Sequence, residues 1–111
     1  MSETPTIHHL VRESAAKKLL FLPRAIRQRN KPDRMITATE VREVVQQIEV
    51  IEYYPEDPRG HSCLLRGEVS SDRIIHVVCS PKEGYLAIIT AYIPNTTEWD
   101  DTRRVRRKGT V

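Results

Sequence analysis

Residues 73–93 read RIIHVVCSPKEGYLAIITAYI, and this stretch decides the fold. It holds two runs rich in β-branched and aromatic residues on either side of Pro-Lys-Glu-Gly, a segment suited to turn torsions. A connection this short joins antiparallel neighbours, so the stretch predicts a β-hairpin. Two further runs upstream extend it to a four-stranded antiparallel meander, with predicted strands at 49–54, 62–68, 73–80 and 85–93.

Three helices are predicted before the sheet. Thr37 and Glu40 have the spacing of a capping box, in which each side chain binds the other residue's backbone N–H, so a helix begins there. Its apolar face consists of Val41, Val44, Val45 and Ile48. Two earlier helices are predicted over residues 9–21 and, with a proline in the first turn, over residues 23–30. Helices followed by a meander are typical of a two-layer α+β domain, with the N-terminal helices packed on a four-stranded antiparallel sheet.

Length and composition restrict the class of protein. The 111 residues suffice for one domain, and 39% apolar with 30% charged residues argue against a disordered chain. The longest apolar run, residues 19–22, is far shorter than the roughly 20 residues that span a bilayer, so we expect a cytoplasmic protein with no membrane partner. We expect an N-terminal helical extension over 1–22, a single α+β domain over 23–101 and a basic C-terminal tail over 102–111.

Charge is distributed unevenly along the chain. Residues 1–35, 36–101 and 102–111 carry net charges of +5, −7 and +5. Clustered cations attract phosphates by releasing condensed counterions, which makes RNA or DNA a reasonable partner. A basic tail is also typical of a solvated chain end, and the charge pattern alone leaves both interpretations open.

Turn length predicts which residues face each other across the second and third strands. The expected register places Arg66 opposite His76 and Cys63 opposite Cys79, on opposite faces of the sheet. We expect the cysteines to be buried thiols, although opposed positions leave a disulfide open. Their spacing matches no zinc motif, so we expect no metal and no cofactor.

Two residues of this predicted hairpin suit phosphate chemistry. His76 interrupts an apolar strand, where an imidazole exchanges protons near neutral pH or packs as a hydrogen-bonded core ring. Arg66 either holds a phosphate as a bidentate fork or neutralises Glu52 or Glu68 on the sheet surface.

Three further polar residues lie on predicted strands. Thr90 and Tyr92 end the last strand, where their hydroxyls either donate to a phosphate or satisfy the end of the sheet. Tyr54 either stacks on a base or occupies its position through β-propensity.

A series of short motifs along the chain carries a family resemblance. The motifs are Met35-Ile36-Thr37, Glu40-Val41-Arg42, Val50-Ile51-Glu52-x-Tyr54-Pro55, Ser62-Cys63-Leu64-Leu65-x-Gly67, Ile75-His76-Val77-Val78 and Ile89-Thr90-Ala91-Tyr92-x-Pro94, followed by Trp99. Over roughly residues 23–107 the chain resembles the domain of unknown function 4258 family. The resemblance implies a RelE/barnase-like fold, similarity to RelE and MqsR toxins, and a cognate antitoxin of the zinc-finger MqsA or YgiT type.

The resemblance also implies site residues. It points to His76, Arg27, Thr90 and Tyr92. The family usually begins its short helix with a His-Ala pair, whereas this chain has Arg24-Ala25 and keeps Arg27. Because an arginine does not shuttle protons near neutral pH, the substitution favours RNA binding without cleavage as an alternative.

We therefore expect the toxin of a type II toxin–antitoxin system, a metal-independent endoribonuclease that cleaves messenger RNA, free or on the ribosome. Phosphate or RNA contacts would come from Arg24, Arg27, Arg66 and Tyr54. His76 would transfer protons while Thr90 and Tyr92 orient the scissile group. The alternatives are a non-catalytic RNA- or ribosome-binding module and a protein-interaction domain whose tail docks on an acidic partner.

Overall fold

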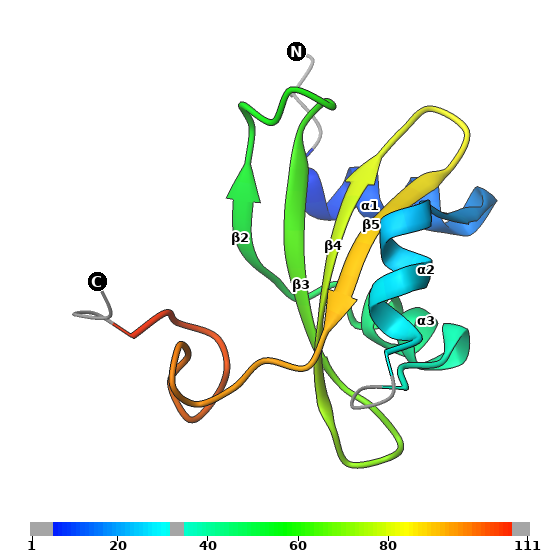
Figure 1. Cartoon of the computed structure of the whole chain (residues 1–111). Helices are drawn as coiled ribbons and strands as arrows, with labels where there is room; N and C mark the ends of the chain where they lie inside the picture. The colour runs from blue at the N-terminus through cyan, green and yellow to red at the C-terminus, as the bar shows by residue number, and fades with distance from the viewer. Residues whose placement is uncertain (1–5, 32–34, 108–111) are drawn as a thin grey trace.

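The computed structural model describes residues 6–31 and 35–107 (Figure 1). Along the chain the elements are α1 (Ile7–Lys17), β1 (Leu19–Phe21), α2 (Pro23–Arg29), α3 (Ala38–Gln47), β2 (Val50–Tyr54), β3 (Ser62–Glu68), β4 (Ile74–Pro81) and β5 (Leu86–Tyr92). The strands form one sheet in the order β1-β5-β4-β3-β2. The predicted α+β class is confirmed. Among the described residues no helix is long and apolar enough to cross a membrane.

The sheet has one strand more than predicted. The helix predicted over residues 9–21 ends at Lys17, and Leu19–Phe21 instead forms β1, which pairs parallel with β5. The prediction of a four-stranded, purely antiparallel sheet was therefore wrong. Helix propensity is overridden here because the backbone of this apolar triplet finds partners on the open edge of β5, a gain that a local pattern does not reveal.

The four predicted strands and their register are otherwise confirmed. Arg66 lies opposite His76, and Cys63 lies opposite Cys79. The two cysteines are buried free thiols with their sulfur atoms 3.8 Å apart. The hydrogen bond with Cys63, together with burial, raises the pKa of Cys79, so this thiol stays protonated.

The capping box predicted at the start of α3 is present and also ties the helix to the sheet. Thr37 and Glu40 exchange their hydrogen bonds, and Glu40 accepts further bonds from Ser71 and Arg73, both at 2.6 Å. Burial acts to raise the pKa of Glu40, but the hydrogen bonds from Arg73, Ser71 and the Thr37 backbone outweigh it and lower the pKa to about 2.

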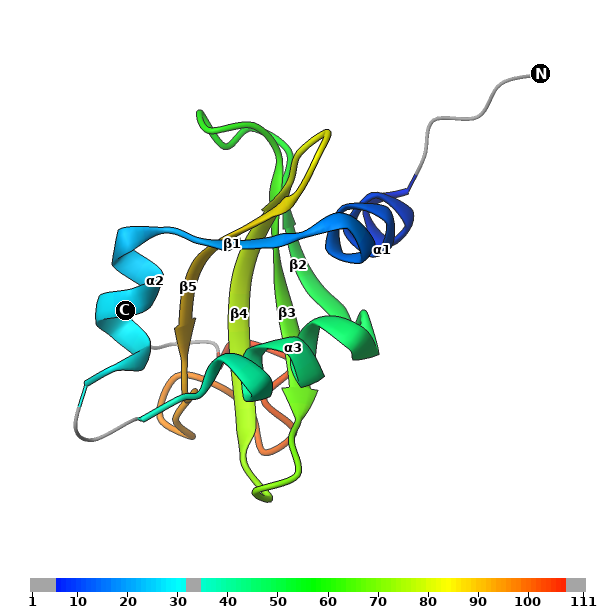
Figure 2. The ribbon, with the colours of Figure 1, turned by 90° about the vertical axis from the view of Figure 1, so that its right-hand side faces the viewer.

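The core lies between the helices and one face of the sheet, which we call the helix face (Figure 2). Its buried side chains include Val11, Val41, Val44, Leu65, Val77 and Ile88. At Gly67 a Cβ atom would lie 2.9 Å from the Cα atom of Val44. This glycine therefore allows β3 and α3 to approach closely.

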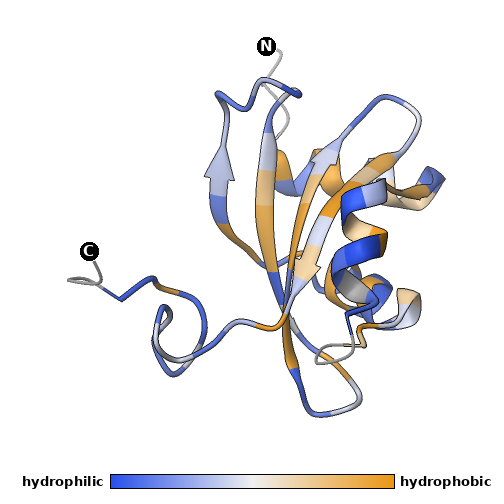
Figure 3. Cartoon of the chain, in the orientation of Figure 1, coloured by the Kyte–Doolittle hydropathy of each residue, from blue (hydrophilic) through white to orange (hydrophobic). Residues whose placement is uncertain are grey.

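The opposite face of the sheet, which we call the outer face, is covered as well. Residues 94–107, here named the C-terminal segment, fold back beside the strands as the orange to red part of the chain (Figure 1). The segment is mostly hydrophilic, whereas hydrophobic residues concentrate on the strands (Figure 3). Its one tryptophan, Trp99, is 1% exposed. The predicted two-layer arrangement has helices on one face of the sheet only, whereas Trp99, Thr102 and Arg103 also cover the outer face around His76 and Arg66.

Candidate functional site

The outer face brings together most of the residues that the sequence singles out. His76 pairs with both Arg66 and Tyr92 across neighbouring strands, and Thr90 lies two residues before Tyr92. Tyr54 lies on β2, the edge strand beside β3. Because side chains alternate between the two faces of a strand, these five residues share one face.

His76 is completely buried, and both of its ring nitrogens have partners. Nε2 lies 2.8 Å from the carbonyl oxygen of Arg103 and Nδ1 lies 3.1 Å from the Tyr92 hydroxyl. A carbonyl oxygen only accepts, so Nε2 carries the proton and Nδ1 accepts from Tyr92. The contact with Arg103 therefore selects one neutral tautomer of His76.

The surroundings of His76 keep it uncharged. Its ring lies edge-on to the Trp99 ring, with centroids 4.5 Å apart. Burial lowers the pKa of His76 to about 4, and the nearby Arg66 acts in the same direction. Burial likewise raises the pKa of Tyr92 to about 12. At neutral pH the pair is a neutral hydrogen-bonded unit in which His76 is fully buried and Tyr92 is partly buried.

Arg66 is also occupied. Its guanidinium is almost fully buried, with Nε donating to the carbonyl oxygen of Thr102 at 2.7 Å and Nη1 lying 3.4 Å from Glu49. A second, exposed carboxylate, Glu68, lies 3.7 Å away. Of the two carboxylates expected to neutralise Arg66, Glu68 lies beside it, Glu49 stands in place of Glu52, and the guanidinium is buried rather than on the surface.

Glu52 binds a cation from the C-terminal segment. Arg106 forms two hydrogen bonds to its carboxylate, at 2.7 and 3.1 Å, and lies over the Trp99 ring at 4.6 Å from the centroid. Burial acts to raise the pKa of Glu52, but hydrogen bonds from Arg106 and Tyr54 outweigh it and lower the pKa. Burial and the contact with Glu52 raise the pKa of Tyr54 to about 12. Tyr54 is therefore held by the carboxylate of Glu52 in a partly exposed cluster.

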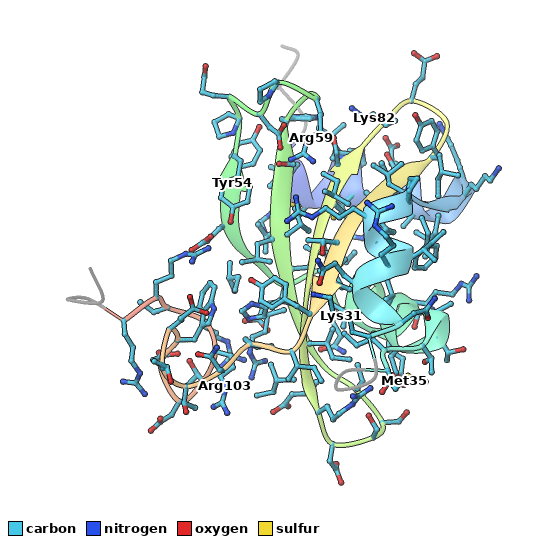
Figure 4. The ribbon with its side chains drawn as sticks, viewed as in Figure 1. Lys31, Met35, Tyr54, Arg59, Lys82 and Arg103 are labelled. Atoms are coloured by element: carbon cyan, nitrogen blue, oxygen red, sulfur yellow. The ribbon has the colours of Figure 1, made fainter. Side chains whose placement is uncertain are left out.

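The C-terminal segment supplies most of the contacts that sequence analysis missed. Arg104 pairs with Glu49, and Arg103 holds His76 through its carbonyl while its side chain lies beside the strands (Figure 4). Arg103 has a φ of 59°, a left-handed conformation that costs a non-glycine residue about 1 kcal/mol. A tryptophan inside an otherwise polar stretch was the signal in the sequence that this segment packs against something.

The remaining two predicted residues, Arg24 and Arg27, lie apart from this cluster. Both are exposed on α2, which packs beside β5 on the helix face (Figure 2). Other cations of the N-terminal half are exposed too. Within the part of the chain that the structure describes, neither these cations nor Arg24 and Arg27 form an ion pair. We call this set the N-terminal cations: Arg12, Lys18, Arg24, Arg27, Lys31 and Arg42.

Comparison with known proteins finds one family. The model of a family described as Domain of unknown function (DUF4258) matches residues 25–93. No curated protein and no solved structure matches this chain. The matched region runs from within α2 to just beyond β5, so the C-terminal segment that covers the outer face lies outside it.

Proposed function

We propose that this chain, a member of the Domain of unknown function (DUF4258) family, binds the phosphate backbone of RNA through α2. The observation that carries the proposal is an exposed row of cations that have no carboxylate partner among the residues described. Arg24, Arg27 and Lys31 follow one another at spacings of three and four residues. Arg24 and Arg27 are three residues apart within α2 and so lie on one side of this helix, and Lys31 follows two residues after the helix ends.

The chemistry of this row suits a polyanion. Arg24 and Arg27 present planar guanidinium groups that bind phosphate oxygens through two parallel hydrogen bonds. Lys31 adds a point charge where α2 ends (Figure 4). Contacts of this kind position a nucleic acid without reading its sequence, and they weaken steeply as salt rises.

Binding is favoured over cleavage by the state of the outer face. A general acid or base must reach the proton that it transfers, directly or through one water molecule. His76 is buried, neutral and hydrogen-bonded at both nitrogens, and Arg66 is bound to a carbonyl oxygen and a carboxylate. Neither group is available to RNA while the C-terminal segment is in place.

A second candidate function has its own observation. A carboxylate, an imidazole and a guanidinium, from Glu52, His76 and Arg66, lie on three neighbouring strands of one face. Such a set serves metal-independent cleavage of RNA, with a base for the 2′-hydroxyl and an acid for the leaving oxygen. In that case the chain would be the endoribonuclease toxin of a two-gene pair with a zinc-finger antitoxin, and the C-terminal segment would leave the outer face before cleavage.

One gel experiment separates the two functions. The full chain is incubated with fluorescent single-stranded RNA in EDTA, and retention and cleavage products are measured over a range of salt concentrations. We expect retention that weakens with salt and no products. Products that disappear in His76→Gln would establish the ribonuclease instead. A chain that neither retains nor cleaves RNA at low salt contradicts both proposals.

A further inference from the structure

A groove runs between α1 and α3, away from the outer face. It consists of two adjoining hollows of about 260 and 290 Å³ that share Ala15, Val45 and Gln46 in their lining. Leu19 lines one hollow and Ile48 lines the other. Both helices lie on the helix face of the sheet, and β1 follows directly after α1 as an edge strand of the sheet (Figure 2). The groove therefore has an apolar floor that is open to solvent.

Each helix presents one stripe of residues to this groove. From α1 the stripe is Arg12, Ala15 and Ala16, and from α3 it is Arg42, Val45 and Gln46. Both follow the i, i+3, i+4 spacing of a single helix face. On the α1 side the floor consists of Ala15 and Ala16, whose small side chains allow another backbone to approach closely.

The rim of the groove is cationic. Arg12, Lys18 and Arg42 are exposed lining residues, and no carboxylate lines either hollow among the residues that the structure describes. The acidic neighbours in sequence are occupied elsewhere. Glu13 faces His9 at 3.2 Å, and Glu43 accepts a hydrogen bond from the Ser70 hydroxyl at 2.8 Å. The charges on the rim are thus left for an external acidic ligand.

We propose that this groove binds an acidic amphipathic helix of a partner protein. An amphipathic helix places apolar side chains at i, i+3, i+4 and i+7, matching an elongated apolar floor, and its flanking carboxylates would meet Arg12, Lys18 and Arg42. RNA fits the groove less well, because within the described ranges no aromatic side chain lines it for base stacking. This site is separate from the α2 row proposed for RNA, so either proposal stands without the other.

The test uses a synthetic probe and two matched variants. The probe is a fluorescein-labelled, alanine-based helix of about 20 residues, long enough to be helical alone, with a leucine stripe flanked by glutamates. A control probe carries lysine in place of each glutamate. Binding to the full chain is measured by anisotropy, and amide NMR spectra locate the site. We expect shifts confined to residues of α1, α3 and the start of β1, and no binding of the lysine probe.

Charge reversal then locates the interaction. Arg42→Glu reverses a charge on the rim, and Arg27→Glu makes the same change on α2. Both side chains are exposed, so neither substitution should disturb the core. Circular dichroism checks that each variant is folded. We expect Arg42→Glu to weaken the acidic helix about tenfold and Arg27→Glu to leave it unchanged.

Three results would overturn the proposal. The first is equal weakening of the acidic probe by both variants, which indicates general charge attraction. The second is amide shifts outside the groove. The third is an Arg42→Glu variant whose affinity for RNA or phosphatidylglycerol vesicles falls more than its affinity for the helix, which would identify a different occupant.

Discussion

Residues 1–35 and 102–111 have the same net charge of +5 in sequence, but the structure treats the cations at the two ends of the chain differently. The N-terminal cations are exposed and form no ion pair among the residues described, whereas three of the four arginines of the C-terminal segment are paired. Arg104 pairs with Glu49, Arg106 with Glu52, and Arg107 with Asp101. A basic cluster thus indicates a polyanionic partner only after the cations that the protein itself neutralises have been set aside.

The difference arises from the acidic middle of the chain. The carboxylates of Glu49 and Glu52 lie at the edge of the sheet where the C-terminal segment returns, and the segment's arginines neutralise them. Trp99 fixes the segment in register by filling the space above His76. The paired and the exposed cations should therefore respond differently to substitution.

The largest expected effect comes from removing the apolar anchor of the C-terminal segment. Trp99→Ala should lower the free energy of unfolding by about 3–5 kcal/mol, because a fully buried indole is removed and its cavity is not refilled. Denaturant unfolding measures the change. The control is Val105→Ala in the same segment, where the side chain is 61% exposed and the change should stay within about 0.5 kcal/mol. Equal effects of the two variants would mean that the segment is not packed on the sheet.

The next largest expected effect is a pH dependence of the free energy of unfolding, which follows from the burial of His76. An unfolded histidine binds its proton below a pKa of 6.5, whereas the folded one stays neutral down to about 4. Between these values the unfolded state binds more protons, so the free energy of unfolding falls as pH falls, by about 3 kcal/mol over the whole window.

His76→Gln should remove this part of the pH dependence, because glutamine keeps a donor and an acceptor but does not titrate. Unfolding of both proteins is compared from pH 7.5 to 5.5, above the range in which unfolded carboxylates begin to bind protons and the lowered pKa values of Glu49 and Glu52 take effect. Identical slopes for the two proteins would show that His76 is not sealed in solution.

RNA affinity should separate the two basic regions directly. Arg24→Gln combined with Arg27→Gln should weaken RNA binding about tenfold and reduce the slope of log affinity against log salt by about 2, one for each guanidinium that no longer meets a phosphate. Filter binding at several salt concentrations measures both values. Arg104→Gln, at a paired arginine of equal charge, should leave affinity and slope unchanged. The reverse pattern would assign RNA binding to the C-terminal segment.

The smallest effect is on stability at a single ion pair. Arg106→Gln should cost about 1 kcal/mol, since the partly exposed bond to Glu52 and the contact with the Trp99 ring are both weakened by solvent. Arg27→Gln should change stability by less than about 0.5 kcal/mol. Thermal unfolding in low and high salt provides the measurement, and the cost at Arg106 should shrink as salt rises. A cost that equals that of Arg27→Gln would remove the distinction between the two regions.

One part of the candidate site could be predicted from the sequence and another part could not. The pairing of Arg66 with His76 could be predicted, because short turns fix the register of a hairpin. The packing of the C-terminal segment over that pair could not be predicted, since no local pattern indicates where a polar segment beyond the last strand packs. Leu19–Phe21 was misassigned for a related reason: its partner strand, β5, lies far along the chain.

By itself the sequence determined the capping box at Thr37, the antiparallel meander and the pairing of Arg66 with His76, because these depend on periodicity and turn length over a few residues. Only the tertiary structure decided which cations the protein neutralises itself and that His76 is closed and neutral. Arg104 and Glu49 are 55 positions apart, and attraction between charges depends on the distance in the folded chain rather than on the position in sequence.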